Sequence, residues 1–104
     1  MIELVNDNLN EIIEENSKVF IMFYADWCPD CSKIKPYFER LSTYYENISF
    51  VHINADESPK SRSIINLTNI PTFLGVFEGN VVETPLIGSK PEKIEEYLQK
   101  LASL

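Results

Sequence analysis

The residues in this chain that are best suited to chemistry are its two cysteines, Cys28 and Cys31, which lie in the run Trp27-Cys-Pro-Asp-Cys31. Two thiols this close can interconvert with a disulfide by thiol–disulfide exchange. They could also supply two ligands to zinc, but a structural zinc site takes four ligands and the chain has only one histidine, His52. The sequence therefore predicts redox chemistry at the cysteine pair and no metal site.

The local pattern places this pair where a strand gives way to a helix. Val19–Tyr24 is a short, uninterrupted apolar run, which is typical of a strand buried on both faces. The first turn of a helix carries unpaired N–H groups and a partial positive charge, so it stabilises a thiolate. Apolar residues recur with helical spacing after the first cysteine, at Cys31, Ile34, Phe38, Leu41 and Tyr45.

The three-residue spacing predicts different roles for the two sulfurs. Cys28, at the helix start, is expected to face solvent and to attack a substrate disulfide as the thiolate. Cys31 lies one turn later on the buried stripe, so we expect its sulfur to point inward and to resolve the mixed disulfide. The alternative is a pair of buried structural cysteines with no redox role. Pro29 suits the first helical turn, where its missing N–H has no intrahelical partner.

The remaining elements alternate between strand and helix. Strand patterns cover residues 2–5, 19–24, 48–54, 72–77 and 81–87, and helix patterns begin near residues 8, 28, 58 and 89. Strands joined through a helix are expected to be parallel, and the last strand is expected to be antiparallel through a hairpin at 78–80. This order predicts an α/β fold of one domain over residues 1–104, with a central mixed sheet of four to five strands flanked by helices on both faces.

Composition narrows the classes of function. The chain has 104 residues, 44% of them apolar, and nine basic against sixteen acidic side chains give a net charge of −7. This charge argues against binding to nucleic acid or to an anionic membrane. No apolar run approaches the roughly 18 residues that span a bilayer. The first residues lack the basic and apolar regions of a signal peptide, so we expect a cytoplasmic protein.

Several motifs together resemble the thioredoxin family over nearly the whole chain. They are the run Phe23–Cys31, then Pro36, Ile70-Pro71-Thr72, Gly79 and Gly88. The resemblance implies a thioredoxin-like fold with a cis peptide bond before Pro71. It also implies that Ile70 pairs backbone to backbone with the substrate and that Trp27 forms an apolar wall beside Cys28. The residues expected to contact substrate are thus Trp27, Pro29, Asp30, Ile70 and Pro71.

The residues between the cysteines depart from the family pattern. Common thioredoxins have Gly-Pro there, whereas this chain has Pro29-Asp30. A carboxylate in the first helical turn favours the helix, but it also disfavours the Cys28 thiolate. Asp30 is therefore expected to stabilise the disulfide over the dithiol. This would make the protein a weaker oxidant than relatives with His at this position.

A second departure concerns a buried carboxylate that thioredoxins typically carry six residues before the first cysteine. In this chain that position holds Met22, and the usual Lys partner on the next strand aligns with His52. Two interpretations stay open. In one, His52, with an ordinary pKa near 6.5, accepts the proton of Cys31 in place of the carboxylate. In the other, His52 is a tolerated strand residue with no role in the chemistry.

The resemblance implies a protein-disulfide reductase that needs no bound cofactor, because the cysteine pair itself carries the electrons. It implies a monomer that acts on disulfides of other proteins and receives electrons from a flavin-dependent thioredoxin reductase or an equivalent donor. A glutaredoxin-like, glutathione-dependent enzyme is the first alternative. Pro29 favours it, whereas Gly88-Ser89-Lys90 lacks the Gly-Gly and acidic pair that usually hold glutathione. A non-catalytic binding module with the same fold is the second alternative.

Overall fold

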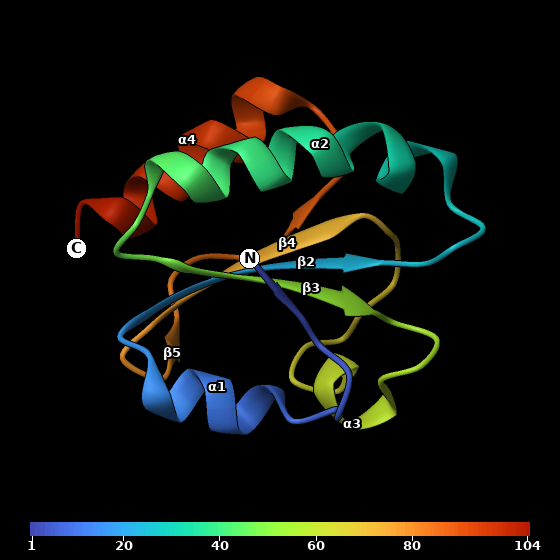
Figure 1. Cartoon of the computed structure of the whole chain (residues 1–104), viewed down its shortest axis with the longest axis horizontal. Coiled ribbons are helices and arrows are strands. Elements are labelled where there is room, and N and C mark those ends of the chain that lie inside the picture. Colours follow the sequence, from blue (N-terminus) through green and yellow to red (C-terminus); the bar gives the residue numbers. More distant parts are fainter.

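A mixed sheet forms the centre of the molecule, which the computed structural model describes over residues 1–104 (Figure 1). Its strands are β1 (Ile2–Glu3), β2 (Lys18–Tyr24), β3 (Ser49–Asn54), β4 (Thr72–Phe77), β5 (Asn80–Val81) and β6 (Leu86–Ile87). The main path runs in the order β1-β3-β2-β4-β5, and β6 also pairs with β4. The three long strands, β2, β3 and β4, therefore lie in the interior of the sheet.

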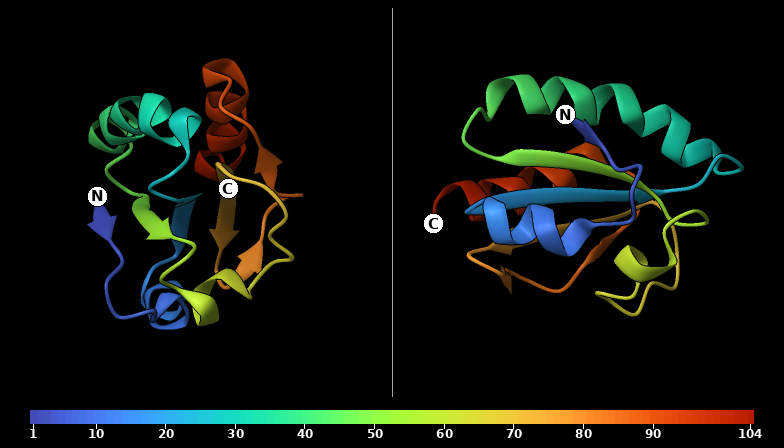
Figure 2. Two further views of the ribbon diagram at one scale, coloured as in Figure 1. Left: turned by 90° about the vertical axis from the view of Figure 1, so that its right-hand side faces the viewer. Right: turned by 60° about the horizontal axis from the view of Figure 1, so that its bottom comes forward.

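Four helices cover the two faces of this sheet. They are α1 (Leu9–Glu15), α2 (Pro29–Tyr44), α3 (Pro59–Arg62) and α4 (Pro91–Ala102). Helices α2 and α4 lie on one face, and α1 and α3 lie on the other (Figures 1 and 2). Alternate residues of β2 enter two separate apolar clusters, one on each face, as a doubly buried strand requires. The predicted α/β class, with helices on both faces of a mixed sheet, is confirmed.

One expected strand direction is wrong. Strands β1, β3 and β2 are parallel, as predicted, but β4 runs antiparallel to β2. A parallel connection needs a crossover that carries the chain back along the strand. The four residues of α3 rise only about 6 Å, against about 20 Å for a six-residue strand. The chain after β3 therefore stays at the end of the sheet where β3 finishes, and β4 starts from that end.

The prediction of one continuous strand over residues 81–87 is also wrong. The segment forms two separate two-residue strands, β5 and β6. Pro85 has no N–H to give to a ladder. The carbonyl oxygen of Glu83 accepts a hydrogen bond from the Tyr97 hydroxyl of α4 at 2.8 Å instead of one from a strand. This break raises the strand count to six, above the four to five predicted.

Strand pairing brings two distant segments together at one edge of the sheet. Phe23, near the end of β2, pairs with Thr72 at the start of β4. The cysteine run follows β2 directly, and Ile70-Pro71 precedes β4 directly. Both segments therefore emerge at the same edge, on the right of Figure 1.

The segment after β3 is anchored by a residue far away in the sequence. Ser58, whose type suits a helix cap, makes no capping bond to α3. Instead, the Asp7 carboxylate accepts hydrogen bonds from the backbone N–H groups of Lys60 at 2.9 Å and Ser61 at 2.7 Å. Desolvation alone would raise the pKa of Asp7, but hydrogen bonding to the Ser61 side chain and to these two backbone N–H groups outweighs it and holds the pKa below its usual value. The start of α3 is thus tied to the loop before α1.

Gly75, in the middle of β4, is a site of close approach by α4. A Cβ atom at this position would lie 2.8 Å from Cε1 of Tyr97. The Gly75 N–H donates a hydrogen bond to the Tyr97 hydroxyl at 3.2 Å, and that hydroxyl donates in turn to Glu83. The Tyr97 ring therefore ties β4 to the interrupted segment between β5 and β6.

We expect Gly75→Ala to lower the free energy of unfolding by about 1–3 kcal/mol, because the added methyl group forces the Tyr97 ring away from β4. Urea denaturation measures this loss. In a Tyr97→Leu background the same substitution should cost clearly less, since the clashing ring is gone. Equal costs in the two backgrounds would show that Gly75 is not there to accommodate Tyr97.

Candidate active site

Cys28 and Cys31 form a disulfide at the start of α2, with their Cα atoms 5.3 Å apart. Cys28 is the N-cap residue with an extended backbone, and Pro29 opens the helix as predicted. The Cys28 sulfur accepts a hydrogen bond from the Cys31 backbone N–H at 3.2 Å. When the disulfide opens, this donor and the helix start stabilise a negative charge on the Cys28 sulfur.

The expected exposure of Cys28 is wrong in this oxidised form. Cys28 is only 5% exposed, and Cys31, which is inward as predicted, is 3% exposed. The Cys28 sulfur is bonded to the inward-pointing sulfur of Cys31 and lies against the first turn of α2 rather than in solvent. A substrate therefore reaches this sulfur only over a small area, and the residues around that area decide what fits.

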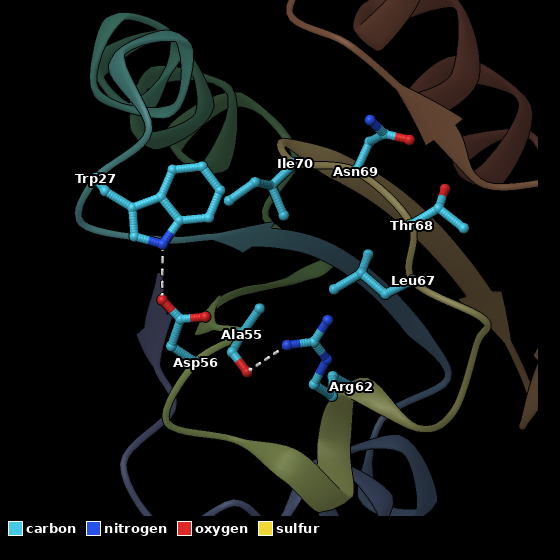
Figure 3. A pocket seen from close by; sticks show the side chains of 8 residues that line it. All are labelled: Trp27, Ala55, Asp56, Arg62, Leu67, Thr68, Asn69 and Ile70. Carbon is cyan, nitrogen blue, oxygen red and sulfur yellow. Dashed lines mark hydrogen bonds between the residues drawn. The ribbon is translucent and has the colours of Figure 1, made fainter.

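Trp27 stands directly before the pair with a largely exposed indole. Its side chain is 69% exposed, and its Nε1 donates a hydrogen bond to Asp56 Oδ2 at 2.9 Å (Figure 3). This bond holds the flat apolar ring toward the loop after β3. Pro29 and Asp30 are also exposed, on the first turn of α2. All three predicted contact residues are thus open to a partner.

The Ile70–Pro71 peptide bond is cis, as the resemblance implied. Pro71 is buried, and its carbonyl oxygen accepts a hydrogen bond from the Gly88 N–H at 3.0 Å. Ile70 is half-buried, and neither its N–H nor its carbonyl oxygen takes part in a backbone hydrogen bond. An unpaired backbone next to a strand can pair with an extended polypeptide.

A pocket of about 240 Å³ opens between Trp27 and the segment that leads into β4 (Figure 3). Arg62, at the end of α3, donates from Nη1 to the Ala55 carbonyl oxygen at 3.2 Å. Sequence reasoning missed both Asp56 and Arg62. Asp56 could have been found from its place just after β3, at the edge that carries the cysteines, but no pattern signals Arg62. The lining residues are Trp27, Ala55, Asp56, Arg62, Leu67, Thr68, Asn69 and Ile70.

His52 lies on β3 in register with Met22 of β2. Both side chains are buried, His52 at 1% exposure and Met22 at 0%. The Nδ1 atom of His52 lies 2.8 Å from Glu3 Oε1, whereas its Nε2 atom has no hydrogen-bond partner. His52 and Cys31 line one pocket of about 150 Å³, together with Asp26. The structure therefore brings these two sequence-predicted residues to a shared cavity.

Burial sets the protonation of His52. Burial lowers the pKa of His52 below its usual 6.5, and the Glu3 carboxylate acts in the opposite direction without reversing the shift. Lys35 and Glu39 of α2 add smaller effects of opposite sign. His52 is therefore neutral at pH 7. Because a carboxylate can only accept, Nδ1 carries the proton, and Nε2 is left as a free acceptor.

The side chain of Tyr24 contacts both His52 and Glu3. Its ring stacks on His52 with centroids 3.7 Å apart, and its hydroxyl donates to the second Glu3 oxygen at 3.1 Å. Burial, followed by the charge of Glu3 and its hydrogen bond, raises the pKa of Tyr24 to about 12. One carboxylate from β1 thus orients two rings from β2 and β3.

Two further properties concern metals and membranes. No group of three or more His, Cys, Asp or Glu side chains is arranged to hold a metal ion. None of the helices combines the length and the apolar character that crossing a membrane requires.

Comparisons with known proteins agree with this geometry. A model of the thioredoxin family matches residues 1–100. Thioredoxin 1 of Plasmodium falciparum is 30% identical over 105 residues, covering 99% of this chain and 100% of that protein. Mitochondrial thioredoxin-3 of Saccharomyces cerevisiae is 33% identical over 97 residues, covering 90% of this chain and 76% of that protein. A solved structure of Plasmodium falciparum thioredoxin superposes with a TM-score of 0.89 at 27% identity, covering 96% and 98% of the two chains.

The family match therefore includes the strand that precedes the cysteines, the helix that follows them and the segment with the cis peptide bond. The cysteine pair lies at disulfide distance at the start of α2, where thiol–disulfide exchange is favoured. With the fold, the pair and the relatives in agreement, the chain belongs to the thioredoxin family and is a protein-disulfide oxidoreductase.

Proposed function

We propose that the chain works as a reductase of protein disulfides, with Cys28 as the nucleophile and Cys31 as the resolving thiol. The observation that carries this proposal is the position of Cys28 as the N-cap of α2, where its sulfur accepts the Cys31 N–H. The helix start favours the thiolate at Cys28. Cys31 lies one turn later on the buried stripe of α2, with Ile34 and Phe38, and this stripe keeps bulky substrates from it.

The cycle needs only the two sulfurs. The Cys28 thiolate attacks one sulfur of the substrate disulfide, forms a mixed disulfide and releases the other substrate sulfur as a thiolate. Cys31 then loses its proton and attacks the Cys28 sulfur, which frees the second substrate thiol and forms the Cys28–Cys31 disulfide. Two electrons have passed to the substrate, so a reductant must return two electrons to the pair.

A flavin-dependent thioredoxin reductase, or an equivalent dithiol donor, is the proposed reductant, and the cytoplasm is the proposed place of action. Membership of the thioredoxin family supports the proposed donor. The number of cysteines supports the proposed compartment. The chain has no cysteine outside the redox pair, and therefore no separate structural disulfide. Proteins of a reducing compartment usually lack structural disulfides. A monomer suffices, since every group in the cycle comes from one chain.

Substrate is proposed to lie across the edge that carries Trp27, Ile70 and Pro71. Ile70 offers an unpaired N–H and carbonyl oxygen to an extended polypeptide, and Trp27 offers a large exposed apolar ring. Pro29 and Asp30 border the same edge from the first turn of α2. These contacts would present the substrate sulfur to the small exposed area of Cys28.

Substitution of each cysteine tests the assigned roles. Cys31→Ser should accumulate a mixed disulfide with a protein substrate such as insulin, because the first attack proceeds and the second cannot. Cys28→Ser, the matched control, should accumulate none. Both single variants should reduce insulin no faster than the variant that carries both Cys28→Ser and Cys31→Ser. Mass spectrometry of acid-quenched mixtures measures the adducts. An adduct that forms on Cys31 but not on Cys28 would reverse the assignment.

The charge of Asp30 is expected to lower the reduction potential of the pair. Asp30 is exposed, so removing its charge should change the balance between thiolate and disulfide by about 0.2–1 kcal/mol. For a two-electron couple this is about 4–20 mV, and Asp30→Asn should have a potential higher by that amount. Equilibration in thiol redox buffers measures both proteins, with the parent expected near the roughly −270 mV typical of thioredoxin.

Glu46→Gln is the matched control, because Glu46 is an exposed acid beyond the far end of α2. The helix from Asp30 to Tyr44 alone spans about 21 Å, which exceeds the Debye length of about 10 Å at 0.1 M salt. This variant should keep the parent potential. An equal shift in both variants would trace the effect to net charge. A parent potential above about −180 mV would favour an oxidase or isomerase over the reductase.

His52 is proposed to accept the proton of Cys31 in the resolving step. Its Nε2 atom is buried and unpaired, and both residues line the same pocket of about 150 Å³. A water molecule has room there and would carry the proton from the Cys31 sulfur to Nε2. Glu3 keeps the proton of the neutral ring on Nδ1, away from that pathway. The alternative is a purely structural His52, held by Tyr24 and Glu3.

His52→Gln should slow the resolving step by on the order of 10²-fold near pH 7, because glutamine has no basic nitrogen. His52→Ala should be similarly slow. In the parent the rate should fall as the pH drops below the lowered pKa of His52, since the protonated ring cannot accept, and the variants should lack this dependence. Single-turnover mixing with acid quench separates attack by Cys28 from resolution by Cys31.

Asp26→Asn is the control for this test, because Asp26 supplies the only carboxylate that lines the shared pocket and could accept a proton there. It should leave the resolving rate and its pH dependence unchanged. Urea denaturation checks that each variant is folded at the assay pH. Parent-like resolution in folded His52→Gln would leave His52 a structural residue, and a loss confined to Asp26→Asn would move the acceptor to Asp26.

A further inference from the structure

The pocket beside Trp27 holds a cation that the proposed cycle does not use. Arg62 is half-buried at the end of α3. Of its five N–H donors, one is used, from Nη1 to the Ala55 carbonyl oxygen at 3.2 Å. Arg62 takes part in neither of the two ion pairs of the molecule. Figure 3 shows its other terminal nitrogen directed away from Ala55, toward the Leu67 side of the pocket.

The acid in the same pocket, Asp56, forms no ion pair with this guanidinium. Asp56 accepts the Trp27 indole N–H at 2.9 Å, so one of its two carboxylate oxygens, Oδ2, is turned toward Trp27 (Figure 3). Its own backbone N–H donates to Asn54 Oδ1 at 3.0 Å, which fixes the loop. Asp7 fixes the start of α3 on the other side. Arg62 is therefore held at the pocket without an ion-pair partner.

The walls of the pocket suit a flexible acidic side chain. Leu67, Ile70 and Trp27 supply apolar surface against which methylene groups can pack. Arg62 supplies a planar fork of donors, which matches a carboxylate. The volume of about 240 Å³ has room for one side chain. Because Arg62 is half-buried, solvent screens its attraction for a carboxylate less than at an exposed site.

We propose that this pocket selects disulfide substrates with an acidic side chain, Glu or Asp, within a few residues of the attacked cysteine, and that Arg62 determines this specificity. The inference rests on the proposed function, because it takes the substrate to lie across Ile70, which also lines the pocket. The net charge of −7 disfavours acidic proteins at long range. The preferred substrate therefore has one acidic residue in an otherwise neutral or basic segment.

Pairs of disulfide-containing peptides that differ only by Glu against Gln test this specificity. The variable residue is scanned through three positions on each side of the attacked cysteine, and kcat/KM for reduction is measured at about 0.15 M salt, where the Debye length is about 8 Å. The parent should prefer Glu about five- to tenfold at one or two positions. Arg62→Gln should bring the ratio to about one. Arg62→Lys should keep part of it, because lysine retains the charge and loses the fork.

Arg40→Gln is the matched control, because Arg40 is the only other arginine, lies exposed on α2 and changes the net charge equally when removed. It should keep the full preference. Three results overturn the proposal: no Glu preference in the parent, a preference that survives Arg62→Gln, or an equal loss in Arg40→Gln. An Arg62-dependent preference for oxidised glutathione, with none among the peptides, would likewise overturn the assigned occupant.

Failure of the proposed reductase function would give a different pattern. A protein that reduces neither peptide of any pair, nor insulin, contradicts the reductase itself. Reduction of both peptides at equal rates contradicts only the role of the pocket. Urea denaturation establishes that Arg62→Gln is folded, and Arg62→Lys supplies the comparison if the glutamine variant is not.

Discussion

The pairing of β2 with β4 is the constraint on which the active site depends. It joins the strand that ends at the cysteine run to the strand that begins after Pro71, with Phe23 opposite Thr72. A slip of one residue would turn the side chains of β4 to the opposite faces of the sheet, so the two apolar clusters fix the register strongly. The distance between the disulfide and the unpaired backbone of Ile70 is thus set by the hydrophobic core.

Two opposing influences meet at the Cys28 sulfur. The N-cap position and the Cys31 N–H favour a negative charge there, whereas Asp30, on the same helical turn, disfavours it. Behind the pair, the buried position that carries an acid in typical thioredoxins is the apolar Met22, and the buried residue in register with it, His52, is a neutral histidine. The site therefore keeps charge at its surface and none in the core beneath it.

Strong local signals made part of this structure predictable from sequence. The apolar run of β2, the helical stripe of α2 and the spacing of the cysteines each depend on neighbouring residues alone. The direction of β4 depends on how the long connection after β3 is folded, so it has no local signature. The break between β5 and β6 has one local sign, Pro85, but it also depends on Tyr97 from α4. The same holds for Arg62, which acquires its setting only when α3 docks beside Ile70.

The bond between Asp7 and α3 bears on the order in which the chain can fold during synthesis. Asp7 leaves the ribosome first, but the N–H group of Lys60 that it binds follows 53 residues later. Strand β1 likewise cannot form its backbone pairing until β3 has been synthesised. Until then the backbone of β1 has no native strand to pair with, and its two-residue length limits its capacity to pair with other nascent chains. Asp7, which fixes the start of α3 beside the pocket that Arg62 lines, is thus synthesised early but reaches its native partners only after more than half of the chain exists.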